Sequence, residues 1–423
     1  MGILLSRTGL RNLVALIGIQ GSNALVPLII VPFALAMIGT EAYAQVAITE
    51  ALSSLALAMV LFSFDVDGVA RIAKLEKPAR PEALGEALSA VVAARLLLFV
   101  VVSPLLLAGY LLSGGQNADL LALWLLVPLG QVFHSYWFYQ AIEDNVVPAA
   151  ITLLSRGITI ATVVLFVRDA SDAAWIPLAV GGPFAIGGMI SLLYLRFGMR
   201  IPVRRVNFPT IASDLLNGKE IFAGNVAVTL YREMNVVILG VVGVPAAGVA
   251  TYALVEKSIK MLQACTRPLN QLFFPKVLRD LRNASSPDRR AIRQISRYTL
   301  PQAAVIVAMM VSLPILYLLA SALFPTLKEL AALPDVVLMA SIMAPAMLLG
   351  LANFMFGTAG LNTLDQRGYY FRAILLTGVL SVGICFLLAW RFGAVGAAWC
   401  FLFSEGLLFV LVFARYLISP RTN

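Results

Sequence analysis

The chain has 423 residues, of which 60% are hydrophobic and only 13% are charged. Soluble domains contain about 45–50% apolar and about 25% charged residues, so this composition excludes an ordinary soluble enzyme. The net charge of +9, from 31 basic and 22 acidic residues, raises the question of where the basic residues lie relative to a bilayer.

Apolar segments of about 20 residues, the length that crosses a bilayer core as a helix, follow one another along the chain. The first follows Arg7 and Arg11 as in a signal peptide, but it is too long for the apolar region of one, so we expect it to be retained. These segments predict an all-α polytopic membrane protein with twelve spans: 12–38, 43–64, 84–112, 119–140, 147–168, 174–196, 221–242, 247–273, 297–321, 336–359, 368–390 and 393–418.

A basic stretch from Arg196 to Lys219 divides the twelve spans into six and six. The predicted domains are therefore an N-terminal lobe at 1–200, a cytoplasmic linker at 201–218 and a C-terminal lobe at 219–423. Turns that contain Gly39 and Gly243 follow the first span of each half. Such a correspondence indicates an internal repeat, as transporters often have.

The basic residues indicate the orientation. With both termini in the cytoplasm, 22 of the 31 Lys and Arg residues lie in cytoplasmic segments and three lie on the opposite side. This agrees with the positive-inside rule. The remaining six lie inside predicted spans: Arg95, Arg156, Arg232, Lys257, Lys260 and Arg267.

A central Arg or Lys costs about 2.5–3.5 kcal/mol on insertion scales, so these six side chains must face protein or water, pair with acids, or snorkel. Lys257, Lys260 and Arg267 share one face of one predicted helix. Two interpretations remain open: ion pairs with Glu233, Glu256 or Glu405, or a positively lined, water-filled cavity for an anionic substrate. Arg267 is near the cytoplasmic edge and could be an anchor.

Four acidic residues, Glu50, Glu233, Glu256 and Glu405, lie inside the spans and are candidates for ion pairing or for carrying a coupling ion. The three cysteines have no metal-binding spacing, and His134 is the single histidine. The sequence therefore predicts no metal site, no cofactor and no catalytic residues.

Six segments resemble motifs of one family. They are Tyr136 to Glu143, which ends the fourth span, Ser155-Arg156 with Val163 to Arg168 in the fifth span, Leu230 to Gly240, Gly248 to Lys257, Pro268 to Pro275, and Phe392 to Glu405. Their order and spacing resemble the bacterial polysaccharide repeat-unit flippases, the Wzx-type members of the multidrug/oligosaccharidyl-lipid/polysaccharide exporter superfamily. Ala141 stands where that family usually has Gly.

The resemblance implies two six-helix lobes around a central cavity. It implies that the protein flips undecaprenyl-diphosphate-linked oligosaccharide repeat units from the cytoplasmic to the periplasmic leaflet of the bacterial inner membrane by alternating access, for surface polysaccharide biosynthesis. H+ or Na+ is the expected coupling ion, in an antiport mechanism. The expected partners are the lipid-linked substrate, membrane lipid, a polysaccharide polymerase and a chain-length regulator, but no nucleic acid.

Cations suit a diphosphate or acidic sugars, and aromatic rings can stack on sugars. The predicted substrate-binding residues are Arg95, Arg156, Arg232, Lys257, Lys260, Arg267, Tyr136, Trp137 and Gln140. One alternative for the aromatic residues is anchoring at the bilayer interface.

Other functions remain as alternatives. A drug or cation exporter of the same superfamily would suit acids better than this basic set. A lipid II flippase of the superfamily usually has more spans. A membrane-embedded polymerase or ligase usually needs a large outer loop, although Asp65-Val66-Asp67 forms the D-x-D pattern that sugar-nucleotide enzymes use.

Overall fold

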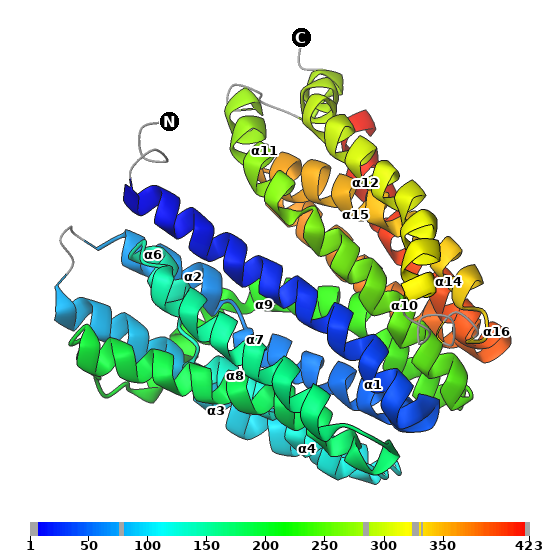
Figure 1. Ribbon diagram of the computed structural model, residues 1–423. Helices are drawn as coiled ribbons and strands as arrows, with labels where there is room; N and C mark the ends of the chain where they lie inside the picture. The colour runs from blue at the N-terminus through cyan, green and yellow to red at the C-terminus, as the bar shows by residue number, and fades with distance from the viewer. Residues whose placement is uncertain (1–6, 76–79, 282–286, 324–329, 331–332, 419–423) are drawn as a thin grey trace. The chain divides into compact units, whose positions relative to one another are not determined.

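The computed structural model describes residues 7–75, 80–281, 287–323, 330 and 333–418, and in these ranges every regular element is a helix (Figure 1). Eight helical stretches of this part are long and apolar enough to cross a bilayer: Gly18–Ala73, Pro81–Leu112, Ala118–Ala141, Val146–Phe166, Ala170–Gly198, Phe208–Val242, Val336–Leu361 and Arg367–Ile418. The predicted all-α polytopic membrane fold is confirmed at this level.

The chain forms two compact units, and the first ends at Thr229. Within it, α8 packs against α5 and α7, and α1 packs against α3 and α7. Its helices are α1 (Arg7–Leu61), α2 (Phe64–Ala73), α3 (Pro81–Leu112), α4 (Ala118–Trp124), α5 (Leu126–Phe133), α6 (Tyr136–Ala141), α7 (Val146–Phe166), η1 (Ala170–Ala174), α8 (Trp175–Leu193), η2 (Tyr194–Gly198) and most of α9 (Phe208–Val242).

The second unit begins at Leu230, inside α9. Within it, α16 packs against α10, α14, α15 and η3. Its further helices are α10 (Ala246–Cys265), α11 (Arg267–Leu281), α12 (Arg289–Leu323), α14 (Val336–Met343), α15 (Ala346–Ala352), η3 (Asn353–Leu361) and α16 (Arg367–Ile418).

Glycines with positive φ divide the longest helices. Gly39 (φ 76°) interrupts α1, and Gly393 (φ 59°) interrupts α16. Only glycine adopts such angles without a steric cost, so each glycine allows a kink at which two helical segments meet. Each of these two helices therefore contains two of the twelve expected spans. The expected spans 247–273 and 297–321 fall on α10–α11 and α12, which are not among the eight.

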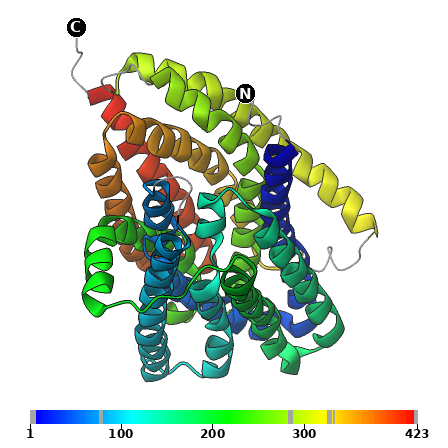
Figure 2. The ribbon, with the colours of Figure 1, turned by 90° about the vertical axis from the view of Figure 1, so that its left-hand side faces the viewer.

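The expected linker at 201–218 is only partly irregular. Residues 201–207 have no regular structure, and α9 begins at Phe208 (Figure 2 shows the irregular segment as a green coil that leads into α9). The backbone N–H groups of Thr210 and Ile211 donate to the carbonyl of Asn207, and Pro209 lies in the first turn, where a missing N–H group has no cost. Residues 208–218 are therefore helical, a feature that the sequence analysis did not predict for the expected linker.

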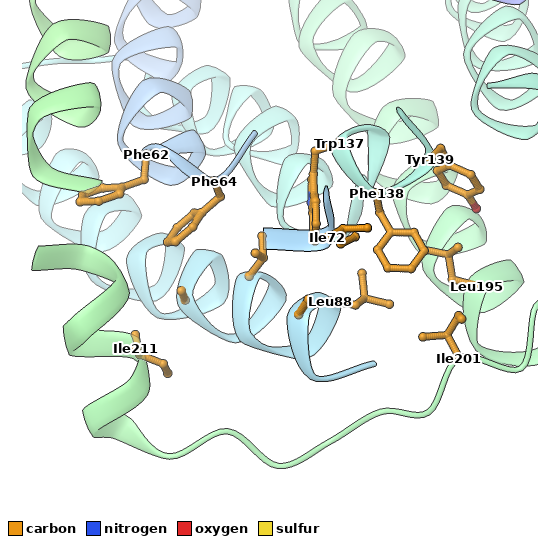
Figure 3. Close-up of a cluster of buried hydrophobic side chains, with 13 residues drawn as sticks. Phe62, Phe64, Ile72, Leu88, Trp137, Phe138, Tyr139, Leu195, Ile201 and Ile211 are labelled. Carbon is orange, nitrogen blue, oxygen red and sulfur yellow. The ribbon is translucent and has the colours of Figure 1, made fainter. Parts of the chain in front are cut away.

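A cluster of buried side chains holds α2 and α6 together in the first unit (Figure 3). Trp137 and Phe138 of α6 meet edge to face, and Phe64 and Ile72 of α2 belong to the same cluster. The Trp137 ring lies so close to Gly68 that it leaves no room for a side chain there. The aromatic run that closes the expected fourth span is therefore mostly core.

Candidate functional site

Arg95 of α3 lies in the first unit with its side chain 1% exposed. Its guanidinium donates to Asp65 Oδ1 at 2.6 Å and to the carbonyls of Gln131 and His134 at 3.3 and 3.1 Å. Those carbonyls lie at the break between α5 and α6, where the helical hydrogen bonds stop. Arg95 therefore satisfies backbone groups that a broken helix would otherwise leave unpaired in the membrane. The structure gives Arg95 protein partners, and contact with substrate stays a prediction.

The ion pair with Arg95 involves Asp65, the first aspartate of the Asp65-Val66-Asp67 pattern. Asp65 is in the first turn of α2 and binds the Arg95 guanidinium. Arg71, in the last turn of α2, binds Asp214 of α9. These contacts tie α2 to α3 and α9, so the first aspartate of the pattern has a structural partner.

Arg156 of α7 lies in a different environment, which we call the N-terminal polar cluster: Asn23, His134, Tyr136, Arg156 and Phe184. Arg156 Nε donates to Asn23 Oδ1 at 3.0 Å, and its guanidinium lies 5.9 Å from the centroid of the Phe184 ring. The His134 ring stacks on Tyr136 at 4.7 Å with an interplanar angle of 6°. Helices α1, α7 and α8 and the break between α5 and α6 thus contribute to one cluster.

The charge of Arg156 is balanced differently from that of Arg95. In the described part of the chain, the groups found against its guanidinium are an amide oxygen and an aromatic ring, both neutral. Arg156 is half-buried in a membrane segment, and an anion would supply the counter-charge that its described neighbours do not. The N-terminal polar cluster is therefore a candidate anion site.

The three uncharged residues predicted to bind substrate, Tyr136, Trp137 and Gln140, have different environments in the structure. Tyr136 is half-buried in the N-terminal polar cluster, and its hydroxyl lies 2.9 Å from Thr152 Oγ1. Trp137 is 1% exposed and packed in the core, so in this conformation its ring contacts protein and has no face available to a sugar. Gln140 is exposed at the end of α6.

Lys260 of α10 is the centre of an ion-pair network in the second unit. Its Nζ lies 2.9 Å from Glu233 Oε2 and 3.3 Å from Glu256 Oε1, and it donates to the carbonyl of Arg232 at 2.7 Å. Glu256 also accepts from the Tyr252 hydroxyl at 3.3 Å. Of the two interpretations open from the sequence, ion pairing is the one that the contacts of Lys260 support.

Arg232 of α9 extends this network toward α16. Its Nη2 donates to Gln263 Oε1 at 2.6 Å, and its Nη1 lies 3.9 Å from Glu405 Oε1. Asn353 of η3 holds Glu405 from the other side, because its Nδ2 donates to Glu405 Oε2 at 2.8 Å and to the Glu405 carbonyl at 3.0 Å. We call Arg232, Gln263, Asn353 and Glu405 the Arg232–Glu405 group.

For the remaining predicted residues, Lys257, Glu50 and Arg267, the structure gives a position on a helix. Lys257 is half-buried on α10, one residue after Glu256, and Glu50 is half-buried on α1 in the other unit. Arg267 begins α11, but its side chain lies outside the described residues. Of the three basic residues expected on one helix face, the structure thus describes the side chains of Lys257 and Lys260, and Lys260 binds acids.

Sequence reasoning missed the uncharged members of both groups. Asn23, Gln263 and Asn353 each bind a predicted charged residue. Gln263 lies three residues after Lys260, on the same helix face, so a search for every polar residue on that face would have found it. Asn353 is an amide within an apolar span, which is the same kind of signal.

Comparisons with known proteins agree with this description. Residues 10–278 match the model of a family described as "Polysaccharide biosynthesis protein". The chain is also 22% identical over 412 residues, 96% of each chain, to a protein of Escherichia coli (strain K12) described as "Putative O-antigen transporter".

Solved structures of transporters share the fold. An inward-facing multidrug resistance MATE transporter of the MOP superfamily superposes with a TM-score of 0.65 at 14% identity, covering 93% of both chains. The lipid II flippase MurJ, in an inward closed conformation, superposes with a TM-score of 0.57 at 11% identity, covering 95% of this chain and 86% of MurJ. These matched proteins are transporters and a flippase, not enzymes. The chain is therefore a multi-pass membrane protein with the fold of MOP-superfamily transporters, and it belongs to the polysaccharide biosynthesis protein family.

Proposed function

We propose that this protein flips lipid-diphosphate-linked oligosaccharide repeat units from the cytoplasmic to the periplasmic leaflet. The family match, the likeness to an O-antigen transporter and the shared fold with a lipid II flippase support a polysaccharide-related flippase. The observation that carries the proposal is Arg156, a cation in a membrane segment whose contacts in the described part of the chain are neutral.

The chemistry of the N-terminal polar cluster suits an anionic, sugar-bearing head group. A guanidinium binds phosphate oxygens or a sugar carboxylate in a bidentate manner, and it does so more strongly in a site of low dielectric constant. Tyr136 adds a half-buried aromatic ring within electrostatic range of this charge, with one face stacked on His134. We propose that Arg156 binds the anionic group of the substrate and that Tyr136 contacts a sugar.

A drug exporter of the same superfamily remains the second candidate, because MATE transporters share the fold. A cationic drug would need a carboxylate without a cationic partner. Among the described residues, no carboxylate contacts Arg156 in the N-terminal polar cluster, and in the second unit Glu233, Glu256 and Glu405 each lie against Lys260 or Arg232. These charges favour the anionic substrate.

The finer features of the proposal come from the sequence. They are twelve spans in two six-helix lobes, cytoplasmic termini, the bacterial inner membrane, coupling to H+ or Na+, and a polymerase and chain-length regulator as partners. The kinks at Gly39 and Gly393, which divide α1 and α16, support the number of spans. The 22 basic residues expected on one side support the orientation.

Complementation tests this function. We expect the chain to restore surface polysaccharide in a bacterial strain that lacks its own repeat-unit flippase, if the strain's repeat unit suits the protein. We expect Arg156→Gln to reduce that export at least tenfold at equal protein level, and Arg156→Lys to retain part of it, because lysine keeps the charge but loses the bidentate geometry.

The matched control is Arg168→Gln, an exposed arginine just after α7, which should export normally. Normal export by Arg156→Gln would remove Arg156 from the site. Failure of the unmodified chain with the repeat units of several strains, together with resistance to cationic drugs, would favour the drug exporter.

A further inference from the structure

The exposed side of α12 changes from arginine to apolar residues along the helix (Figure 1). Four exposed arginines lie in its first nine residues, and we call them the basic face of α12: Arg289, Arg290, Arg293 and Arg297. At about 100° per residue, the exposed apolar residues that follow fall within the same arc of roughly 100°. These apolar residues are Leu300, Ala304, Val307 and Val311.

The length of α12 places this change near the boundary of a bilayer. The helix has 35 residues, or about 52 Å at the rise of an α-helix, whereas a bilayer core is about 30 Å thick. The expected span 297–321 therefore leaves the first turns outside the core. Leu300 is 68% exposed and Val311 is 65% exposed, as suits contact with acyl chains. The basic face then lies at the depth of the head groups.

The turns that carry the basic face are packed on their other side. Ala291 and Ile295 are fully buried. The Tyr298 ring lies 5.8 Å from the Phe273 ring of α11, and its hydroxyl donates to Asp280 Oδ2 at 2.6 Å. These contacts fix the rotation of α12 against α11, so the arginines are held outward by the fold.

The acids of this region already have partners. The sequence from 267 to 323 contains two of them, Asp280 and Asp288. Tyr298 binds Asp280, and Asp288 Oδ1 accepts from the backbone N–H groups of Arg290 and Ala291 at 2.9 and 2.8 Å, as an N-cap. Among the described residues, the ion pairs include none formed by the basic face.

Other arginines of the protein have partners within the chain. Arg71 binds Asp214, and Arg415 Nε donates to Gln366 Oε1 at 2.9 Å. The basic face instead presents four positive charges outward, where phosphate groups of lipids lie. Guanidinium groups bind phosphate oxygens in a bidentate manner, so the charge and the depth of this face are complementary to anionic head groups.

We propose that the basic face of α12 binds the phosphate groups of anionic phospholipids in the surrounding bilayer. The occupant is a lipid and not free phosphate, because the arginines continue directly into exposed apolar residues that suit acyl chains. Bound lipid stabilises the second unit, since a ligand that binds only the folded state raises stability. This surface is separate from the N-terminal polar cluster, which belongs to the first unit.

Binding of fluorescent phosphatidylglycerol to the full-length protein in nonionic detergent tests this surface. We expect phosphatidylglycerol to bind more tightly than phosphatidylcholine and to raise the melting temperature more. Each arginine near an anionic lipid contributes about fivefold in affinity, so Arg293→Gln/Arg297→Gln should raise the Kd for phosphatidylglycerol at least tenfold. High salt should weaken binding to the unmodified protein.

Two further variants serve as controls. Arg168→Gln/Arg391→Gln removes the same charge from two other exposed positions and should keep the affinity for phosphatidylglycerol. Arg293→Lys/Arg297→Lys keeps the charge of the basic face and should retain most of the binding.

The outcomes decide which lipid the basic face takes. Equal affinity of the unmodified protein for phosphatidylglycerol and phosphatidylcholine, or an unchanged Kd in Arg293→Gln/Arg297→Gln, would overturn the proposal. Farnesyl diphosphate, a probe with the lipid-diphosphate chemistry of the proposed substrate, should bind this variant as tightly as the unmodified protein. Loss of both probes by the folded variant would show that the face takes the lipid diphosphate, which would also contradict the proposal.

Discussion

At the scale of single residues, the charged side chains inside the membrane segments have different tasks. Arg95 donates to a carbonyl at the break between α5 and α6 and pairs with Asp65. The described contacts of Arg156 are with neutral groups. The sequence places both inside spans but does not distinguish them, since the distinction depends on which carbonyls and carboxylates other helices bring near. A charged residue in a span is thus a strong signal of an interior position and a weak signal of substrate contact.

Arg95 offers a test of this distinction. We expect Arg95→Gln to lower stability by about 1–3 kcal/mol for each buried partner left unsatisfied, because the carbonyls of Gln131 and His134 would lose their donor. The melting temperature in detergent should fall, while the protein that remains folded still binds farnesyl diphosphate. The control Arg168→Gln should melt like the unmodified chain. A variant of Arg95 with normal melting and lost binding would show that Arg95 contacts substrate.

At the scale of elements, apolar segment lengths and glycines predict most of the helices. The turns expected at Gly39 and Gly243 are present, and their φ angles are nearly equal at 76° and 78°. The sequence did not predict the two breaks that divide the expected fourth span into α4, α5 and α6, or the helix at 208–218. The break between α5 and α6 depends on a donor from another helix, Arg95, and such a tertiary contact is not visible in a local pattern.

The glycine kinks give a second prediction. We expect Gly39→Ala to destabilise the protein by about 1–3 kcal/mol, because φ 76° with ψ 173° is a backbone conformation that is essentially restricted to glycine. No atom lies within 4 Å of the added Cβ, so this cost is conformational and not steric. Gly157→Ala, in the middle of α7 and also without close neighbours, should be neutral or stabilising by about 0.5–1 kcal/mol.

Thermal melting of the two alanine variants side by side measures the difference. Equal melting temperatures would contradict a role for positive φ at Gly39. Gly68→Ala should destabilise more than either, because the Trp137 ring occupies the space that its Cβ would need.

At the scale of the whole molecule, composition and charge placement predict the membrane class, and the ordered motifs predict the family that the comparisons confirm. The site was predicted less completely. Ion pairs between Lys260, Glu233 and Glu256 depend on how α9 and α10 are rotated against each other, and a sequence fixes that rotation only through packing. The alternatives of paired and substrate-binding cations therefore required the structure.

Translocation by the purified protein tests the central claim most directly. The protein is reconstituted into vesicles that contain a fluorescent lipid-diphosphate-linked oligosaccharide, and the substrate that becomes accessible from the opposite leaflet is measured over time. We predict that vesicles with the unmodified protein exchange the lipid between leaflets, that Arg156→Gln slows this exchange at least tenfold, and that Arg168→Gln does not. Exchange by the unmodified protein at the rate of protein-free vesicles, across several repeat units, would contradict the account.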